Sequence, residues 1–317
     1  MRGLRAVASR FSPSGRERNL WLVSRAPGTP AIDQILLGEN LELLPGFADG
    51  SFQLIYIDPP FNTGRAQARK TLRAVRDDEG ERTGFQGRRY STELLSEHSY
   101  GDRHEDYPAF LAPRLHEAHR LLAREGTLYF HIDYREAHRC KLALDGIFGR
   151  ECFLNELIWA YDYGARAKRR WPAKHDTILV YVKDPDAYHF DSEQVDREPY
   201  MAPGLVTPEK VARGKLPTDV WWHTIVPTTG SEKTGYPTQK PEGIVRRIVQ
   251  ASSRPGDWCL DFFAGSGTLG AVAAKLDRHY VLIDSNPEAV EIMRARLGHP
   301  LPATDGDAST NAGEGAS

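Results

Sequence analysis

Short apolar runs alternate with segments of helical spacing between residues 31 and 298. Apolar runs bounded by Gly, Pro, Asp or Asn are typical of buried strands, and apolar positions repeated every three to four residues are typical of helices that pack on a sheet. The pattern predicts strands at 52–57, 127–132, 177–182, 258–262 and 280–283. It predicts helices at 107–122, 135–148, 244–251, 269–276 and 287–297.

This alternation predicts an α/β fold with a mostly parallel, twisted sheet and helices on both faces. The last helix is marked at both ends. Asn286 can cap it, Pro287 suits the first helical position and Gly298 can end it.

Four segments flank or interrupt the alternation. Residues 1–30 are interpreted as a loose arm, and residues 299–317, which are small and polar, as a disordered tail. Residues 64–104 are rich in Arg and Gly, residues 184–235 are rich in Pro, Trp and Tyr, and neither shows a clear period. Because long irregular insertions are usually functional, we expect substrate recognition in these two segments.

The composition is that of an ordinary globular protein, with 40% hydrophobic and 26% charged residues in 317. No apolar run approaches the roughly 18 residues that a membrane helix needs, so we expect no membrane association. The cysteines Cys140, Cys152 and Cys259 have neither metal-ligand spacing nor the number for a disulfide framework, which favours a reducing cytoplasm and no metal. The basic N-terminus faintly resembles a transit peptide, but a disordered basic arm is the favoured interpretation.

The net charge of -2 hides two basic clusters. Each cluster alone is more readily explained as a solvated surface, but two together favour phosphate binding. The residues that we expect to contact DNA are Arg65, Arg69 and Lys70 in the first cluster and Arg166, Lys168, Arg169 and Arg170 in the second.

A glycine turn follows the strand at 258–262. Gly265 and Gly267 stand between this strand and the next helix, where glycines allow the backbone to approach a ligand closely. Asp284 ends the following strand, at the spacing where an acid accepts hydrogen bonds from ribose hydroxyls. Helix packing alone explains many such glycines, but the combination favours a nucleoside-containing cofactor. The third glycine comes one position too early for the nicotinamide pattern, which disfavours NAD.

The strand at 52–57 ends in Asp58, Pro59, Pro60 and Phe61. Two prolines make a stiff turn with free carbonyl groups, beside a carboxylate and an aromatic ring. If Asp58 and the Pro59 carbonyl each accept one N–H of an exocyclic amine, the nitrogen lone pair is directed at a methyl donor, while Phe61 stacks on the flipped base. The alternative is a merely rigid turn.

Together, the turn at Asp58 and the sequence Asp261-Phe-Phe-Ala-Gly-Ser-Gly-Thr268 resemble the amino-methyltransferases of bacterial restriction-modification systems. The catalytic motif precedes the glycine motif, as in their β class. This resemblance implies a Rossmann-like methyltransferase fold with circularly permuted motif order, S-adenosylmethionine as cofactor and double-stranded DNA as substrate. It also implies a catalytic half at 31–183, a target-recognition region at 184–235 and a cofactor half at 236–298.

The cofactor residues implied by the resemblance lie in three segments. One segment, residues 238–240, belongs to the sequence Tyr236-Pro-Thr-Gln-Lys-Pro241, and the resemblance places it near the methionine end of the cofactor. The residues are Asp261, Phe262, Phe263, Ala264, Gly265, Ser266, Gly267 and Thr268; Thr238, Gln239 and Lys240; and Asp284.

Family members with Asp first in the catalytic motif usually methylate N6 of adenine, which is the activity expected here. The alternatives are an N4-cytosine enzyme, an enzyme that methylates RNA or a protein amide, and a catalytically silent relative that binds nucleic acid. A C5-cytosine enzyme needs a cysteine nucleophile, which typically follows a proline. No cysteine in this sequence follows a proline, so that class of enzyme is excluded. The recognition sequence, an accompanying restriction endonuclease and a homodimer are left open.

Overall fold

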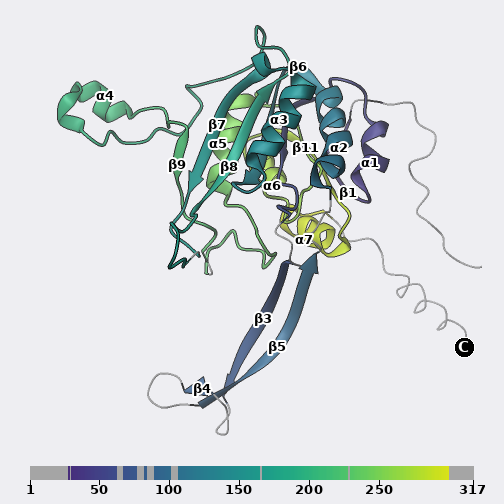
Figure 1. Cartoon of the computed structure of the whole chain (residues 1–317), viewed down its shortest axis with the longest axis vertical. Coiled ribbons are helices and arrows are strands. Elements are labelled where there is room, and N and C mark those ends of the chain that lie inside the picture. Colours follow the sequence, from purple (N-terminus) through teal and green to yellow (C-terminus); the bar gives the residue numbers. More distant parts are fainter. Residues whose placement is uncertain are drawn as a thin grey trace, which may run out of the picture.

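The structure is a computed structural model that describes residue 28 and residues 30–62, 67–76, 82–83, 89–100, 106–164, 166–227 and 229–299. Its centre is an eight-stranded sheet with the order β1-β11-β10-β2-β6-β8-β7-β9 (Figure 1). The strands are β1 (Gln34–Leu37), β2 (Phe52–Ile57), β6 (Leu122–Asp133), β7 (Phe153–Ala160), β8 (His175–Val182), β9 (Val220–Trp222), β10 (Trp258–Asp261) and β11 (His279–Asp284).

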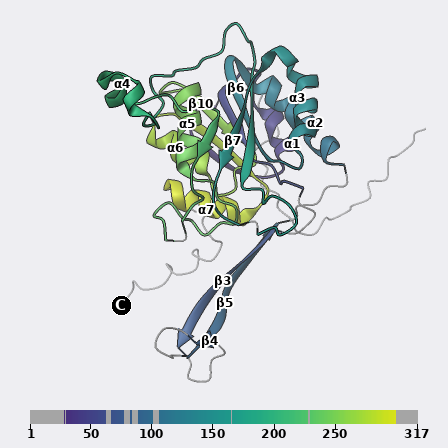
Figure 2. The ribbon, with the colours of Figure 1, turned by 60° about the vertical axis from the view of Figure 1, so that its left-hand side comes forward.

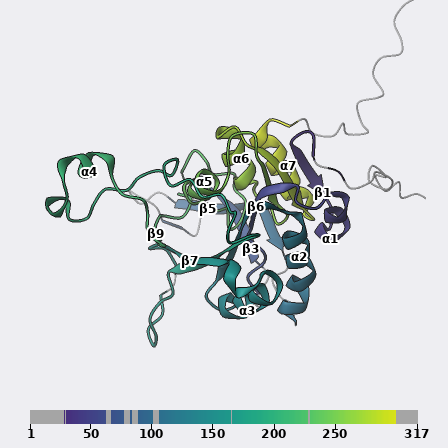
Figure 3. The same ribbon diagram turned by 90° about the horizontal axis from the view of Figure 1, so that it is seen from above.

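Helices cover both faces of this sheet. On one face lie α1 (Asn40–Leu43), α2 (Tyr107–Leu121) and α3 (Ala137–Phe148); on the other lie α5 (Glu242–Ser252), α6 (Thr268–Lys275) and α7 (Pro287–Leu297), as Figures 2 and 3 show. Alternate residues of β2 enter the two cores: Ile55 and Ile57 join one, Leu54 and Tyr56 the other. Because both faces are buried, β2 is a nearly continuous apolar run.

β8 is antiparallel to both of its neighbours, β6 and β7, whereas the other paired strands of this sheet are parallel. The start of β8 therefore lies at the same edge as the carboxyl ends of β2, β6, β7, β10 and β11. Asp133 at the end of β6 pairs in register with Asp176 in β8. Ligands of open α/β sheets bind at this carboxyl edge.

The predicted α/β fold is confirmed, as are all five predicted strands and five predicted helices, with small differences at their ends. The Asn286 side chain accepts a hydrogen bond from the Glu288 backbone N–H at 3.0 Å, and Gly298 ends α7 with φ +71°. Residues 1–27, 29 and 300–317 are outside the described residues, so the predicted arm and tail stay predictions. β1 and β9 were missed because they are very short, and β7 because it carries Asn155 and Glu156.

The expectation of irregular backbone in the insertion 64–104 is wrong for much of its length. β3 (Gln67–Arg76) and β5 (Arg89–Tyr100) form a long antiparallel hairpin, to which β4 (Arg82–Thr83) adds. The hairpin projects away from the eight-stranded sheet (Figures 1 and 2). Since it lies apart from the main core, packing does not impose the apolar–polar alternation by which strands are recognised.

The segment 184–235 is also more regular than expected. It contains a 3-10 turn, η4 (Pro203–Leu205), the short helix α4 (Pro208–Arg213) and β9, which extends the main sheet beside β7. α4 lies on an extension away from the sheet (Figure 3). Two further 3-10 turns, η1 (Leu44–Gly46) and η3 (Arg150–Cys152), connect elements of the core. Within the described ranges, no helix is long and apolar enough to cross a membrane.

Candidate active site

Five aspartates meet at the carboxyl edge of the sheet: Asp58, Asp133, Asp176, Asp261 and Asp284. Each stands at or beside the end of a different strand, and together they line one cleft of about 970 Å³. The turn at Asp58 and the glycine turn, which the sequence places about 200 residues apart, thus line the same cleft.

The turn after β2 places Asp58 in the lining of this cleft. Asp58 Oδ2 accepts a hydrogen bond from Lys240 Nζ, whereas Oδ1 is buried and has no hydrogen-bond partner among the described residues. The Tyr107 hydroxyl donates to the Pro60 carbonyl at 2.6 Å, and Lys240 Nζ lies 4.8 Å from the centre of the Phe61 ring. The turn is therefore fixed on both sides, while one carboxylate oxygen stays available as an acceptor.

The glycine turn is fixed by the two acids that flank it. Gly265 and Gly267 have φ of +49° and +71°, in the left-handed region that favours glycine. Asp284 accepts from the Gly265 N–H at 2.8 Å and from the Asn286 N–H at 2.9 Å, and Asp261 accepts from the Phe263 N–H at 2.9 Å. Asp284 thus holds the turn, and its expected contact with ribose hydroxyls stays a prediction.

The electrostatics of this wall favour a cationic ligand. Burial, with the charges of Asp58 and Asp284 nearby, raises the pKa of the Asp261 carboxyl well above its usual range. Burial likewise raises the pKa of Asp284. Carboxylates that are this poorly solvated gain from a positive charge beside them. The donor set therefore fits S-adenosylmethionine, which carries a positive sulfur and an ammonium group.

The segment 238–240 crosses the cleft between the two turns. Thr238 has φ +57°, and Gln239 accepts from the Thr234 N–H at 2.8 Å and donates to the Glu232 carbonyl at 2.6 Å. The Thr268 hydroxyl donates to the Lys240 carbonyl at 3.1 Å. All three predicted residues line the cleft, together with Asp261, Phe262, Phe263, Ala264, Gly265, Ser266, Thr268 and Asp284. Gly267 is the one predicted cofactor residue that does not line the described cleft.

A buried network of hydrogen bonds lies beside Phe61. The Tyr56 hydroxyl is 2.9 Å from His131 Nδ1, and His131 Nε2 is 3.3 Å from Asp176 Oδ2. The Tyr161 hydroxyl donates to Asp176 Oδ1 at 3.1 Å, and the rings of Phe61 and His131 are 5.9 Å apart. Burial raises the pKa of Tyr56 well above its ordinary value, and nearby carboxylates add to this rise. Burial alone would raise the pKa of Asp176, but the hydrogen bond with His131 lowers it.

A second set of cleft residues was missed by sequence reasoning. Asn40 donates to the Phe262 carbonyl at 3.1 Å and accepts from Arg114 Nε at 2.9 Å, and Arg114 also pairs with Glu39. Glu39 and Asn40 follow β1, so the strand-end rule that found Asp58 would have found them. β1 is only four residues long, however, and its pattern was too short to predict a strand.

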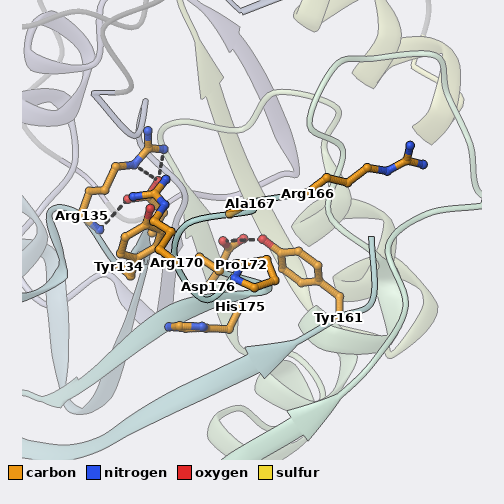
Figure 4. Close-up of a pocket in the computed structure, with 11 residues that line it drawn as sticks. Tyr134, Arg135, Tyr161, Arg166, Ala167, Arg170, Pro172, His175 and Asp176 are labelled. Carbon is orange, nitrogen blue, oxygen red and sulfur yellow. Dashed lines mark hydrogen bonds and ion pairs between the residues drawn. The ribbon is translucent and has the colours of Figure 1, made fainter. Parts of the chain in front are cut away.

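The residues that we expected to contact DNA lie in two separate regions of the structure. Arg65 is outside the described residues, while Arg69 and Lys70 belong to β3 in the projecting hairpin. Arg166, Lys168, Arg169 and Arg170 lie on the loop between β7 and β8, at the carboxyl edge of the sheet. Arg166 and Arg170 line a second cavity of about 480 Å³, and this cavity shares Asp133, Arg135, Tyr161, Ala173 and Asp176 with the main cleft (Figure 4).

Comparison with solved structures places this fold among methyltransferases. The complex of M1.HpyAVI with S-adenosylmethionine is 19% identical, with a TM-score of 0.53, and covers 83% of this chain and 98% of its own. The cytosine-N4-specific PvuII DNA methyltransferase is 16% identical, with a TM-score of 0.58, and covers 84% and 87%. These similarities confirm the expected Rossmann-like methyltransferase fold.

The sequence model of the family described as DNA methylase matches residues 52–295, which is most of the chain. The protein therefore belongs to the N6/N4 DNA methylase family, as its motifs indicated. The DNA adenine methyltransferase YhdJ of Escherichia coli is 29% identical over 271 residues, covering 83% of this chain and 82% of its own. The type II methyltransferase M.HpaI of Haemophilus parainfluenzae is 29% identical over 269 residues, covering 84% and 74%.

Proposed function

We propose that the protein transfers a methyl group from S-adenosylmethionine to N6 of an adenine flipped out of double-stranded DNA. The observation that carries this proposal is the buried Oδ1 of Asp58, an acceptor without a partner among the described residues, in a cleft that the glycine turn also lines. The similarity to the adenine methyltransferase YhdJ supports adenine as the target.

In this proposal the chain activates an amine whose lone pair is delocalised into the base. Asp58 Oδ1 accepts one N–H and the Pro59 carbonyl the other, so that the nitrogen becomes more tetrahedral and its lone pair points away from the turn. Phe61, which lies over His131, stacks on the base and fixes its plane. The cofactor supplies a methyl group on a positively charged sulfur. As nitrogen gains the methyl group it loses a proton, which Asp58 or water accepts.

Lys240 has a positioning role in this arrangement. Its ammonium group binds Asp58 Oδ2 and lies 4.8 Å from the centre of the Phe61 ring, so it holds one carboxylate oxygen in place and leaves Oδ1 for the substrate. The glycine turn and Asp261, Asp284 and segment 238–240 would hold the cofactor. A cognate restriction endonuclease and a homodimer stay predictions.

N4 of cytosine is the second candidate, because the same pair of acceptors suits any exocyclic amine and the cytosine-N4 enzyme PvuII shares the fold. The test is to incubate the protein with unmodified duplex DNA, RNA and labelled S-adenosylmethionine, and to identify the labelled nucleoside. We expect N6-methyladenine from duplex DNA. N4-methylcytosine would establish the second candidate, and labelled RNA alone would overturn both.

A further inference from the structure

The loop between β7 and β8, residues 161–174, stands at the rim of the catalytic cleft. Tyr161, Tyr163 and Gly164 on its outgoing limb and Ala173 on its returning limb line the same cleft as Asp58. Its base is held firmly: the Tyr161 N–H donates to the Lys174 carbonyl at 3.0 Å, and Lys174 pairs with Asp162. The tip is therefore presented from a rigid stem beside the site of chemistry.

Four cationic side chains on this loop, Arg166, Lys168, Arg169 and Arg170, are exposed, unlike Lys174, which pairs with Asp162. In the part of the chain that the structure describes, no carboxylate lies within ion-pair distance of Arg166, Lys168, Arg169 or Arg170, whereas Arg135 on the other wall of the second cavity is paired with Asp133. In Figure 4, Arg166 extends to one side of Tyr161, and Arg135 and Arg170 lie on the other. Unpaired guanidinium groups at a rim suit phosphates.

Trp171 is the most exposed of the tryptophans for which the structure gives an exposure. It is 94% exposed and lies between Arg170 and Pro172, whereas Trp159 and Trp221 are 3% and 7% exposed. Pro172 restricts the backbone beside it, so the indole is carried on a stiff limb. An exposed, flat aromatic side chain among cationic residues is typical of sites that stack on nucleic-acid bases.

We infer that Trp171 is the wedge that enters the duplex when the target base leaves it, stacking on the neighbouring bases, while Arg166 and Arg170 bind the flanking phosphates. This inference rests on the proposed function and adds to it the element that opens the duplex. Flipping a paired base costs several kcal/mol of pairing and stacking, roughly the scale that an inserted side chain can offset. The wedge matters most when the target base is paired.

The experiment first maps the modified sequence in DNA of cells that express the protein, and then uses two synthetic duplexes of that sequence. One has the target base correctly paired, and the other has it opposite a mismatched base. We expect Trp171→Ala to slow single-turnover methylation of the paired duplex about tenfold or more and that of the mismatched duplex less than about threefold. Trp171→Phe, which keeps a stacking ring, should remain within about threefold of the wild type on both.

Leu142→Ala is the matched control, since Leu142 is an apolar residue of α3 that is 72% exposed and outside both cavities. It should methylate both duplexes at the wild-type rate. If Trp171→Ala slows both duplexes equally, or neither, the wedge is excluded, even though the wild-type activity sustains the proposed function.

A second measurement does not depend on methyl transfer. Duplex DNA should quench part of the tryptophan emission of the wild type, and this part should be missing from Trp171→Phe. Equal quenching in the two proteins would overturn the inference. Absence of methylation by the wild type with quenching intact would instead overturn the proposed function alone.

Discussion

The two walls of the catalytic cleft differ in how their charged groups are satisfied. On the glycine-turn wall, residues 261–268 and 284–286, the acids accept hydrogen bonds from backbone N–H groups at 2.8–2.9 Å and are mostly buried. On the β7–β8 loop, Arg166, Lys168, Arg169 and Arg170 are exposed, and the described residues offer these four cations no ion-pair partner. Glycines show the same contrast. A Cβ at Gly267 would lie 2.7 Å from Met293, whereas one at Gly164 would meet nothing within 4 Å.

The difference matches the two ligands of the proposed function. A small cationic cofactor gains from acids that are already fixed and poorly solvated, because little reorganisation is needed when it binds. A long polyanion gains from exposed cations that can adjust to successive phosphates. Asp58 lines the same cleft as both walls, and four tests probe the contrast, from the largest expected effect to the smallest.

Asp58→Ala removes the group that both walls serve. We expect methyl transfer to fall by about a hundredfold to a thousandfold or more, because the amine loses its ionised acceptor. Cofactor affinity should change less than about threefold, since the glycine turn is intact. Methylation assays and calorimetry on folded protein measure the two effects. Asp49→Ala, on an exposed carboxylate, is the control, and retained activity in Asp58→Ala would refute the role of the carboxylate.

Gly267→Ala and Gly164→Ala compare the rigidity of the walls directly. Both glycines have positive φ, +71° and +75°, so the backbone disfavours alanine at each position. Only Gly267→Ala must also displace Met293 in the core, at a further cost of about 1–3 kcal/mol. Urea unfolding measures the difference between the two variants. Equal losses of stability would mean that the glycine-turn wall is not the more tightly packed one.

Arg166→Ala combined with Arg170→Ala tests the β7–β8 loop. If both arginines bind phosphates, the slope of log affinity against log salt should become shallower by about 1.8 for duplex DNA of any sequence. Fluorescence anisotropy at several salt concentrations gives the slope. Arg124→Ala, which removes an exposed arginine that pairs with Asp184, should leave it unchanged. An unchanged slope in the double variant would make the loop an ordinary solvated surface.

Asp261→Asn tests the burial of charge on the glycine-turn wall. The raised pKa means that the folded state holds the Asp261 proton more tightly than the unfolded state, whose pKa is about 3.9. Folding is therefore opposed by ionisation, and the free energy of unfolding falls as pH rises from that value towards the raised pKa. Asn keeps an acceptor for the Phe263 N–H, so the variant should flatten this fall. Urea unfolding of the wild type and of Asp261→Asn from pH 5 to 8 measures this difference. If the free energy of unfolding depends on pH in the same way in both proteins, the burial argument is contradicted.

The sequence was sufficient for most groups that follow clearly patterned strands, but not for Glu39 and Asn40, which follow the short strand β1. Asp58, Asp284 and the glycine turn were located because the carboxyl ends of parallel strands share an edge. Lys240 was expected near the cofactor, but its pairing with Asp58 depends on a contact across 182 residues. Tyr56 and His131 were missed as site residues because they lie inside apolar strands and look like core; only the register of β2, β6 and β8 brings them together with Asp176.

The ion pair between Lys240 and Asp58 also joins two residues that the ribosome makes at different times. At translation rates of about 5–20 residues per second, the ribosome makes Asp58 about 10–40 s before it makes its partner. During that interval β2 also lacks β10, its parallel neighbour, and presents an open apolar edge. β6 pairs with the opposite edge of β2, so early folding of α2 and β6 leaves this edge open until β10 is made. A truncated chain that ends before the segment 238–240 would expose it permanently and should be a target for proteolysis.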